Sequence, residues 1–365
     1  SHLRPAVTQA FILAAIVIAS GAVAPSARAQ EQTQQMVATV SVGNGPAGVA
    51  YDPAKGEVFV TDLLNGTVSV ISDATNAVVA TVKVGSHPAG AAYDPSKGDV
   101  FVTNALDNTT SVISDSSDSV VSTVEVGGGP TGVAYDPARD EAFIANYLGD
   151  TVSVISDSTY AVVATVSVGS YPYAPVYDAA KGEIFVTNAL DNTTSVISDT
   201  TNAVVATVAV GSGPTGGAYD AAKGEVFVAD FLGSTLSVIS DETNRVVATV
   251  NVQVNPTGIA YDSSSGQILV TNAANNTVSV VSDSTNAVVA TLKVGSDPSG
   301  VDYDTAKGEV FVANNGDDTV SVISSSFSST SSTAPEFPVA SLPVVVLAVV
   351  ATVALASRRI HPGAG

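Results

Sequence analysis

One tyrosine recurs at a fixed spacing along most of the chain. Tyr51 is followed at intervals of 42 residues by Tyr93, Tyr135, Tyr177, Tyr219, Tyr261 and Tyr303. The residues around each tyrosine are close copies of the stretch from Gly48 to Val84. Seven copies without an insertion or deletion indicate one supersecondary unit repeated seven times. A unit of about 42 residues rich in short β runs is typical of a propeller blade.

Each repeat contains four runs that predict β-strands. In the first copy they span residues 48–51, 57–62, 67–72 and 77–84, named here strands A, B, C and D. Strands B and C are mostly apolar, as expected where neighbouring blades cover both faces of a sheet. Between the runs lie turn formers, of which Asn65–Gly66 is the strongest hairpin signal. The repeat therefore predicts a four-stranded antiparallel blade.

The two ends of the repeat array complement each other. Residues 36–42, MVATVSV, match the fourth strand of the later repeats, whereas the seventh repeat stops after Ile323 without a fourth strand. The N-terminal strand is therefore expected to complete blade seven. Such closure removes free sheet edges. The predicted fold is all-β, a closed seven-bladed propeller over residues 36–323.

Charge and composition exclude several partner classes. Residues 31–336 hold all 34 acidic residues against nine basic ones, a balance of −25. This surface repels phosphate backbones, so no nucleic-acid partner is expected. It is interpreted as a solvated exterior, with cation binding or a saline habitat left open. The chain has no cysteine, which excludes disulfides and thiolate chemistry.

The flanking segments predict export and anchoring. Residues 1–29 have the layout of a secretory signal peptide, with an uncleaved anchor as the alternative, and residues 30–35 form a polar linker. Residues 324–336 are a Ser/Thr-rich stalk, residues 337–357 an apolar helix long enough to span a bilayer, and residues 358–365 a basic tail. Basic residues on the inner side place the propeller at the extracellular face of the cell membrane.

The strand B motif resembles a known repeat family. It reads FVTD, FVTN, FIAN, FVTN, FVAD, LVTN and FVAN, preceded by GxPxGVAYD and followed by VSVI and TNxVVATV. This pattern resembles the YVTN-family β-propeller repeat of archaeal surface-layer-type proteins, with Phe or Leu in place of the family's Tyr. The resemblance covers residues 36–323. It implies a propeller with a role at the cell surface.

The tail resembles a second known element. Pro335, Glu336 and Phe337 precede the apolar run, which a basic pair follows. This arrangement resembles the PEF-type C-terminal sorting signal handled by archaeosortases. The resemblance implies that the helix is cleaved and replaced by a lipid-type anchor. A simple transmembrane anchor remains the alternative.

The loops between strands D and A carry most of the variation between repeats. By analogy with other propellers, these loops and the B–C hairpins are expected on one face. The residue before the loop proline varies, and the candidate ligand-binding residues are His87, Tyr171, Asn255 and Asp297, together with Tyr173 after the proline of repeat four. Aromatic side chains on a rim suit sugars or peptides. Neutral variation in a permissive loop is the alternative.

Four Asn-x-Thr sequons fall in or beside the B–C hairpins. The candidate glycosylation sites are Asn65, Asn108, Asn192 and Asn275. Asn is also a favourable hairpin residue, so both interpretations stay open.

The sequence offers little for catalysis. His87 is the one histidine within the propeller, so no His-rich metal or haem site is expected. The aspartates that follow the repeated tyrosines are interpreted as turn residues, because catalysis needs asymmetry. No catalytic residue, metal ligand or cofactor is predicted. Calcium binding is left open, although no loop has the spacing of an EF-hand.

These observations favour a non-enzymatic cell-surface propeller. Its expected role is envelope structure, adhesion or recognition of cell-surface glycans or proteins, including surface-layer neighbours. The alternative is an extracytoplasmic enzyme, such as a lactonase-like hydrolase or a quinone-dependent dehydrogenase, since propellers host both. A passive spacer that binds no ligand is a third possibility.

Overall fold

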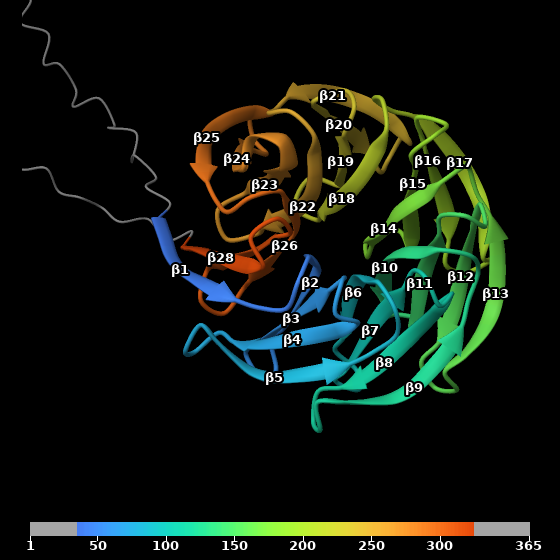
Figure 1. Cartoon of the computed structure of the whole chain (residues 1–365). Coiled ribbons are helices and arrows are strands. Elements are labelled where there is room, and N and C mark those ends of the chain that lie inside the picture. Colours follow the sequence, from blue (N-terminus) through green and yellow to red (C-terminus); the bar gives the residue numbers. More distant parts are fainter. Residues whose placement is uncertain (1–34, 325–365) are drawn as a thin grey trace, which may run out of the picture. The chain divides into compact units, whose positions relative to one another are not determined.

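The computed structural model describes residues 35–324, which form a ring of seven four-stranded antiparallel sheets (Figure 1). The A strands lie innermost: β2 (Pro46–Asp52), β6 (Pro88–Asp94), β10 (Pro130–Asp136), β14 (Pro172–Asp178), β18 (Pro214–Asp220), β22 (Pro256–Asp262) and β26 (Pro298–Asp304). The B strands follow: β3 (Glu57–Asp62), β7 (Asp99–Asn104), β11 (Glu141–Asn146), β15 (Glu183–Asn188), β19 (Glu225–Asp230), β23 (Gln267–Asn272) and β27 (Glu309–Asn314).

The outer half of each blade is equally regular. The C strands are β4 (Thr67–Ser72), β8 (Thr109–Ser114), β12 (Thr151–Ser156), β16 (Thr193–Ser198), β20 (Thr235–Ser240), β24 (Thr277–Ser282) and β28 (Thr319–Ser324). The D strands form the rim: β5 (Ala77–Lys83), β9 (Ser119–Glu125), β13 (Ala161–Ser167), β17 (Ala203–Ala209), β21 (Arg245–Asn251), β25 (Ala287–Lys293) and β1 (Gln35–Ser41). A short 3-10 helix, η1 (Ala273–Asn275), replaces the hairpin turn of blade 6.

Blade 7 is completed by the N-terminal strand, as predicted. Its order is β1-β28-β27-β26, and β1 pairs antiparallel with β28, with Thr39 opposite Ser321 (Figure 1). Strands B and C match their predicted bounds in the first repeat. Strand A is longer than predicted, and Gln35 and Ser324, assigned from sequence to the linker and the stalk, are strand residues. The ring therefore closes through pairing of two segments nearly 290 residues apart.

The flanking predictions lie outside the described residues. They concern the signal peptide, most of the linker and stalk, the apolar helix 337–357 and the basic tail. Between residues 35 and 324, the structure contains no helix with the length and apolar character needed to cross a membrane.

The hydrophobic core lies between blades. The phenylalanine of strand B is fully buried in six blades, at Phe59, Phe101, Phe143, Phe185, Phe227 and Phe311, and Leu269 takes its place in blade 6. One cluster joins Phe143 and Val154 of blade 3 to Ile184 and Ile197 of blade 4. Because each sheet packs between two others, strands B and C are apolar on both faces.

Small residues let the inner strands approach closely. A Cβ atom at Gly48 would lie 2.4 Å from the carbonyl oxygen of Ala89 in the next blade, so this position requires glycine. The equivalent residue is glycine in every blade except blade 4, which has Ala174. In the same region Val176 is larger than the alanine of most blades, and a Cβ at Gly217 of blade 5 would lie 2.7 Å from Val176 Cγ2. The large and the small residue therefore compensate each other.

The last residue of strand B fixes the loop that precedes strand A. Asn104 donates through Nδ2 to Thr109 and Ser111 Oγ atoms at 3.0 Å, and its Oδ1 accepts the Gly85 N–H at 3.1 Å. Asn104 is fully buried. The motif's final Asn or Asp is thus a structural anchor for the D–A loop.

The turns gather at two opposite ends of the ring. The D–A loops and B–C hairpins meet at one end, where Leu63 N–H donates to Gly45 O at 3.0 Å; we call this end the variable face. The A–B and C–D turns meet at the other, where Asp73 N–H donates to Gly56 O at 3.0 Å; we call it the constant face. The predicted grouping of loops is therefore confirmed.

Candidate ligand-binding face

The residue before the loop proline has the same unusual backbone in all seven blades. Its φ angle is positive at Gly45, His87, Gly129, Tyr171, Gly213, Asn255 and Asp297, between 51° and 66°. Gly, Asn, Asp and His are the residues that favour this left-handed region, whereas a tyrosine there is an outlier. The backbone thus accounts for much of the variety at this position. Among the seven residues at this position, Tyr171 is the one whose type the left-handed backbone does not explain.

The conformation of Tyr171 is held from two sides. Its N–H donates to Asp150 Oδ1 of blade 3 at 3.0 Å, and its carbonyl accepts the Ala189 N–H at 2.9 Å. Strained residues persist where surrounding contacts determine their conformation, and they cluster at binding sites. The side chain at this position is therefore a candidate for function.

Tyr171 belongs to a cluster of three tyrosines on the variable face. Its ring stacks on Tyr147 of blade 3 with centroids 4.5 Å apart, and Tyr173 meets Tyr147 edge-on at 6.4 Å. Tyr171 and Tyr173 keep 38% and 40% of their surface exposed. The structure thus brings together the two tyrosines singled out from sequence and adds Tyr147. This aromatic cluster presents flat apolar surface beside three hydroxyl groups.

His87 lies at a separate point of the variable face. It lines an open groove of about 610 Å³ between blades 1 and 2, with Leu64, Leu106, Asp107 and Lys83 among the other lining residues. The groove combines apolar walls with an imidazole and charges of both signs. Besides the tyrosine cluster, this groove is a second place on the variable face where a side chain of a partner could bind.

Asn255 and Asp297 lie in the loops of blades 6 and 7. The Asn255 carbonyl accepts the Ala273 N–H at 2.9 Å, and the Asp297 N–H donates to Asn276 Oδ1 at 3.0 Å. Both residues belong to other blades than the tyrosine cluster of blades 3 and 4. Their residue types suit the left-handed backbone, so their proposed binding role stays a prediction.

The four sequon asparagines are exposed, and each has a structural contact. Each Oδ1 accepts a backbone N–H of a D–A loop, in the pairs Asn65–Asn44, Asn108–Gly129, Asn192–Gly213 and Asn275–Val254. This bond explains why asparagine is favoured at these positions. Glycosylation modifies the other side-chain atom, Nδ2, and stays a prediction.

The constant face repeats one polar contact around the ring. A cation of the A–B turn reaches the aspartate after strand C of the next blade, in the pairs Lys55–Asp115, Lys97–Asp157, Arg139–Asp199, Lys181–Asp241, Lys223–Asp283 and Lys307–Asp73. Blade 6 has Ser265 instead, which bonds to Asp262. The aspartates after the tyrosines also act as turn residues, as predicted, for example when Asp52 Oδ1 accepts the Ala54 N–H at 2.8 Å. These contacts join blades.

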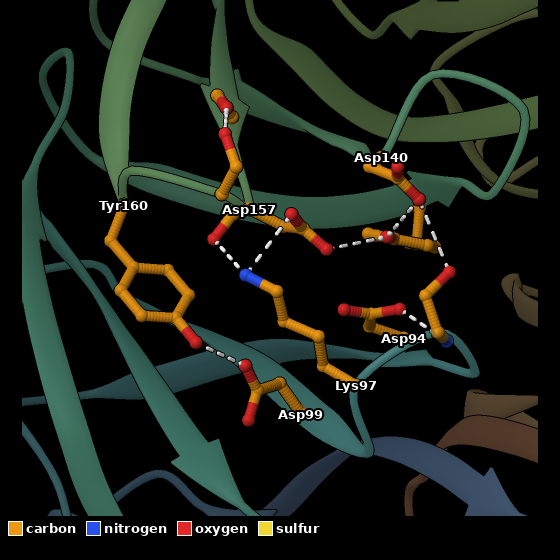
Figure 2. Close-up of polar contacts among 10 residues, drawn as sticks. Asp94, Lys97, Asp99, Asp140, Asp157 and Tyr160 are labelled. Carbon is orange, nitrogen blue, oxygen red and sulfur yellow. Dashed lines mark hydrogen bonds and ion pairs between the residues drawn. The ribbon is translucent and has the colours of Figure 1, made fainter.

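The interface of blades 2 and 3 extends this contact (Figure 2). Lys97 Nζ lies 3.2 Å from Asp157 Oδ1 and 4.8 Å from the centre of the Tyr160 ring. Tyr160 in turn donates to Asp99 Oδ2 at 2.5 Å. Tyr160 has a φ of 49° where most other blades have Asn. It is therefore a second strained tyrosine, and its contacts are within the protein.

The same interface holds a buried tyrosine hydroxyl among carboxylates. Tyr135 donates to Asp157 Oδ2 at 3.0 Å, and Asp140 Oδ1 lies 3.5 Å from the hydroxyl. Asp94 accepts the Ser96 N–H at 2.7 Å and is fully buried. Burial raises the pKa of Asp94, and burial and the neighbouring aspartates raise that of Tyr135. Within residues 35–324, no group of three or more Asp, Glu, His or Cys side chains is arranged to hold a metal ion.

One carboxylate stands apart on the inner strands. Asp302 occupies a position that is Ala in five blades and Val in one. Its two oxygens accept the N–H groups of Tyr51 and Tyr303, each at 2.8 Å, and so connect blades 7 and 1. Burial raises the pKa of Asp302 to about 6, despite these two donors. Asp302 therefore has a structural role, because its hydrogen bonds link blade 7 to blade 1.

Sequence reasoning missed two features of the variable face. Tyr147 lies 24 residues before Tyr171, in a hairpin of the preceding blade, and carries no motif. The exposed leucines of five hairpins, described below, were also overlooked. A comparison of equivalent positions across the repeats could have found the leucines, because Ala274 and Gly316 interrupt their series. The residue equivalent to Tyr147 varies from repeat to repeat, so no pattern marks that tyrosine.

Comparisons with known proteins show the fold alone. No family model matches the chain, and no curated protein matches it. Among solved structures, the chain is similar to hydrazine synthase of Kuenenia stuttgartiensis, with a TM-score of 0.70 and 17% identity over 78% of this chain and 96% of that chain. At this identity the similarity supports a seven-bladed propeller. The resemblance to the YVTN repeat therefore stays a prediction.

Proposed function

We propose that this chain is a non-enzymatic cell-surface propeller that recognises a ligand through its variable face. The observation that carries the proposal is Tyr171, which adopts a backbone unfavourable for tyrosine and stacks on Tyr147 beside Tyr173. A scaffold role would be met by glycine, which blades 1, 3 and 5 use at this position. The cost of the tyrosine is best explained by what its side chain binds.

The proposed location at the extracellular face of the membrane has sequence support. Residues 1–29 resemble a signal peptide, and residues 337–357 form an apolar run behind a PEF-like motif. In that setting the ligands available to the variable face are glycans and proteins of the cell envelope. Glycans attached at Asn65, Asn108, Asn192 or Asn275 would stand on the same face, with Asn192 in the B–C hairpin of blade 4 itself, and would limit the access of large partners.

The proposal is tested with two variants of the same kind on opposite faces. Tyr171→Gly restores the common residue of the variable face, and Tyr160→Asn does the same on the constant face. Both should leave the free energy of unfolding within about 1 kcal/mol, because relief of strain offsets lost ring contacts. Binding is measured with the full chain on a glycan array and in a pull-down from cell-envelope extract.

We expect Tyr171→Gly to lose most of the binding signal and Tyr160→Asn to keep it. Tyr147→Ala should reproduce the loss, since it removes the stacking partner. Equal binding by the wild type and all three variants would show that the tyrosine cluster is not the recognition site.

A further inference from the structure

Five leucines on the variable face are left largely in water. Leu64, Leu106, Leu148, Leu190 and Leu232 occupy the same position in the B–C hairpins of blades 1 to 5 and are 61% to 70% exposed. We call these five residues the leucine arc. Blades 6 and 7 have Ala274 and Gly316 there. An exposed apolar series in consecutive blades is typical of an interaction surface.

Packing within the blade accounts for only part of each leucine side chain. A Cβ at Gly129 would lie 2.9 Å from Leu148 Cγ, and one at Gly213 would lie 2.9 Å from Leu232 Cγ. One side of these leucines thus covers the left-handed glycine of its own blade. The remaining two thirds of the side chain has no partner within the described chain that would account for it.

A sevenfold apolar feature elsewhere provides a contrast. The outer strands expose one valine in every blade, Val37, Val79, Val121, Val163, Val205, Val247 and Val289, at 48% to 55%. A feature shared by all blades is explained by the repeat itself. The leucine arc is limited to blades 1 to 5, and four of these blades also carry the His87 groove or the tyrosine cluster, so the arc overlaps the candidate site.

The turns of both faces contain more acidic than basic residues, and those of the variable face contain no Lys or Arg at all. The D–A loops and B–C hairpins contain six exposed aspartates and no Lys or Arg: Asp107, Asp150, Asp191, Asp297, Asp317 and Asp318. The A–B turns of the constant face carry six cations, the pairs described above. A partner of the variable face therefore meets apolar side chains flanked by negative charge.

We infer that the leucine arc docks a basic amphipathic polypeptide segment, which presents apolar side chains to the leucines and Lys or Arg to the aspartates. This inference rests on the proposed function and names its partner. Sugars are a poorer match, because branched aliphatic side chains offer neither a flat face nor hydrogen bonds to hydroxyl groups. A second copy in face-to-face contact would bring twelve aspartates together, and an anionic membrane surface would be repelled.

The test uses the full chain and defined model peptides. Fluorescence anisotropy compares a labelled amphipathic leucine–lysine peptide with a serine–lysine peptide of equal charge and a leucine–glutamate peptide of the same pattern. We expect the leucine–lysine peptide to bind at least about tenfold more tightly than either control. Equal binding of the two lysine peptides would overturn the inference, because attraction would then be electrostatic alone.

Two protein variants locate the binding. One replaces the five leucines of the arc by Ser, and its matched control replaces Val79, Val121, Val163, Val205 and Val247 by Ser, so both keep the wild-type charge. The leucine variant should weaken binding at least about tenfold, and the valine control should stay within about twofold. Should the fivefold variant not fold, the pair Leu148→Ser and Leu190→Ser serves the same purpose. Unchanged affinity in a folded leucine variant would refute the arc as the docking surface.

The outcomes also separate this inference from the proposed function. If Tyr171→Gly loses a ligand on the glycan array while no leucine substitution affects peptide binding, the recognition role stands and the polypeptide partner is wrong. If neither set of substitutions affects any binding, the proposed function fails as well.

Discussion

The two faces of the ring differ in how closely they follow the repeat. On the constant face, a cation from one blade reaches an aspartate of the next in six of seven interfaces. On the variable face, blades 1 to 5 differ from blades 6 and 7 in their leucines, and blade 4 differs from all others in its tyrosines. Contacts that repeat hold blades together. In our proposal, departures that leave side chains exposed serve recognition, whereas departures with internal partners are local adjustments of packing.

The strongest test of this comparison uses two tyrosines of blade 3 on opposite faces. Tyr135 is buried, stacks on Phe101 with centroids 6.0 Å apart and donates to Asp157. Tyr135→Ala should lower the free energy of unfolding by about 3–5 kcal/mol, since it leaves a cavity and removes the hydrogen bond to Asp157 Oδ2. Tyr147→Ala should cost only about 1–2 kcal/mol, the contribution of its two aromatic contacts at the surface, with Tyr171 and Tyr173.

Urea unfolding measures both effects, and the binding assays supply the second readout. Tyr135→Ala should retain binding at temperatures where it is folded, whereas Tyr147→Ala should lose it. A comparable stability loss in both variants would remove the distinction between the faces.

The second prediction concerns the inner strands of blades 4 and 5. Gly217→Val introduces the residue of other blades at a position where Val176 already fills the space. Overpacking should cost about 1–3 kcal/mol. The double variant with Val176→Ala should recover most of this loss, which a double-mutant cycle in chemical denaturation measures. Additive effects would show that the two positions are not coupled.

The third prediction concerns Asp302, which differs from the residue of the other blades and lies on an inner strand, away from both faces. Its carboxyl keeps a proton to about pH 6 in the folded chain and only to about pH 4 when unfolded. The folded state binds more protons between these values, so the free energy of unfolding falls as the pH rises through this window. Because the side chain is partly exposed, we expect on the order of 1 kcal/mol.

Asp302→Ala restores the residue of five other blades and should remove this part of the pH dependence. Denaturation of both proteins at about pH 4 and pH 7 isolates the effect from other carboxyl groups, such as Asp304 close by. The same pH dependence in both proteins would contradict the assignment.

The smallest effect is expected at Tyr160, a residue of the constant face that replaces the Asn of most other blades. Tyr160→Phe keeps the strained backbone and the ring beside Lys97 and removes only the hydrogen bond to Asp99. It should lower the free energy of unfolding by about 1 kcal/mol or less and leave ligand binding unchanged. A loss of binding would show that the constant face also contributes to recognition.

The number of blades, their strand order and the closure by the N-terminal strand followed from the sequence alone. These features depend on local signals, namely the 42-residue period, turn residues such as Asn65–Gly66 and a strand motif displaced to the start of the chain. Only the tertiary structure placed Tyr147 against Tyr171, gathered the five leucines on one face and gave Tyr171 its left-handed backbone. Those features depend on how neighbouring blades pack, and spacing within one repeat carries no information about contacts made between repeats.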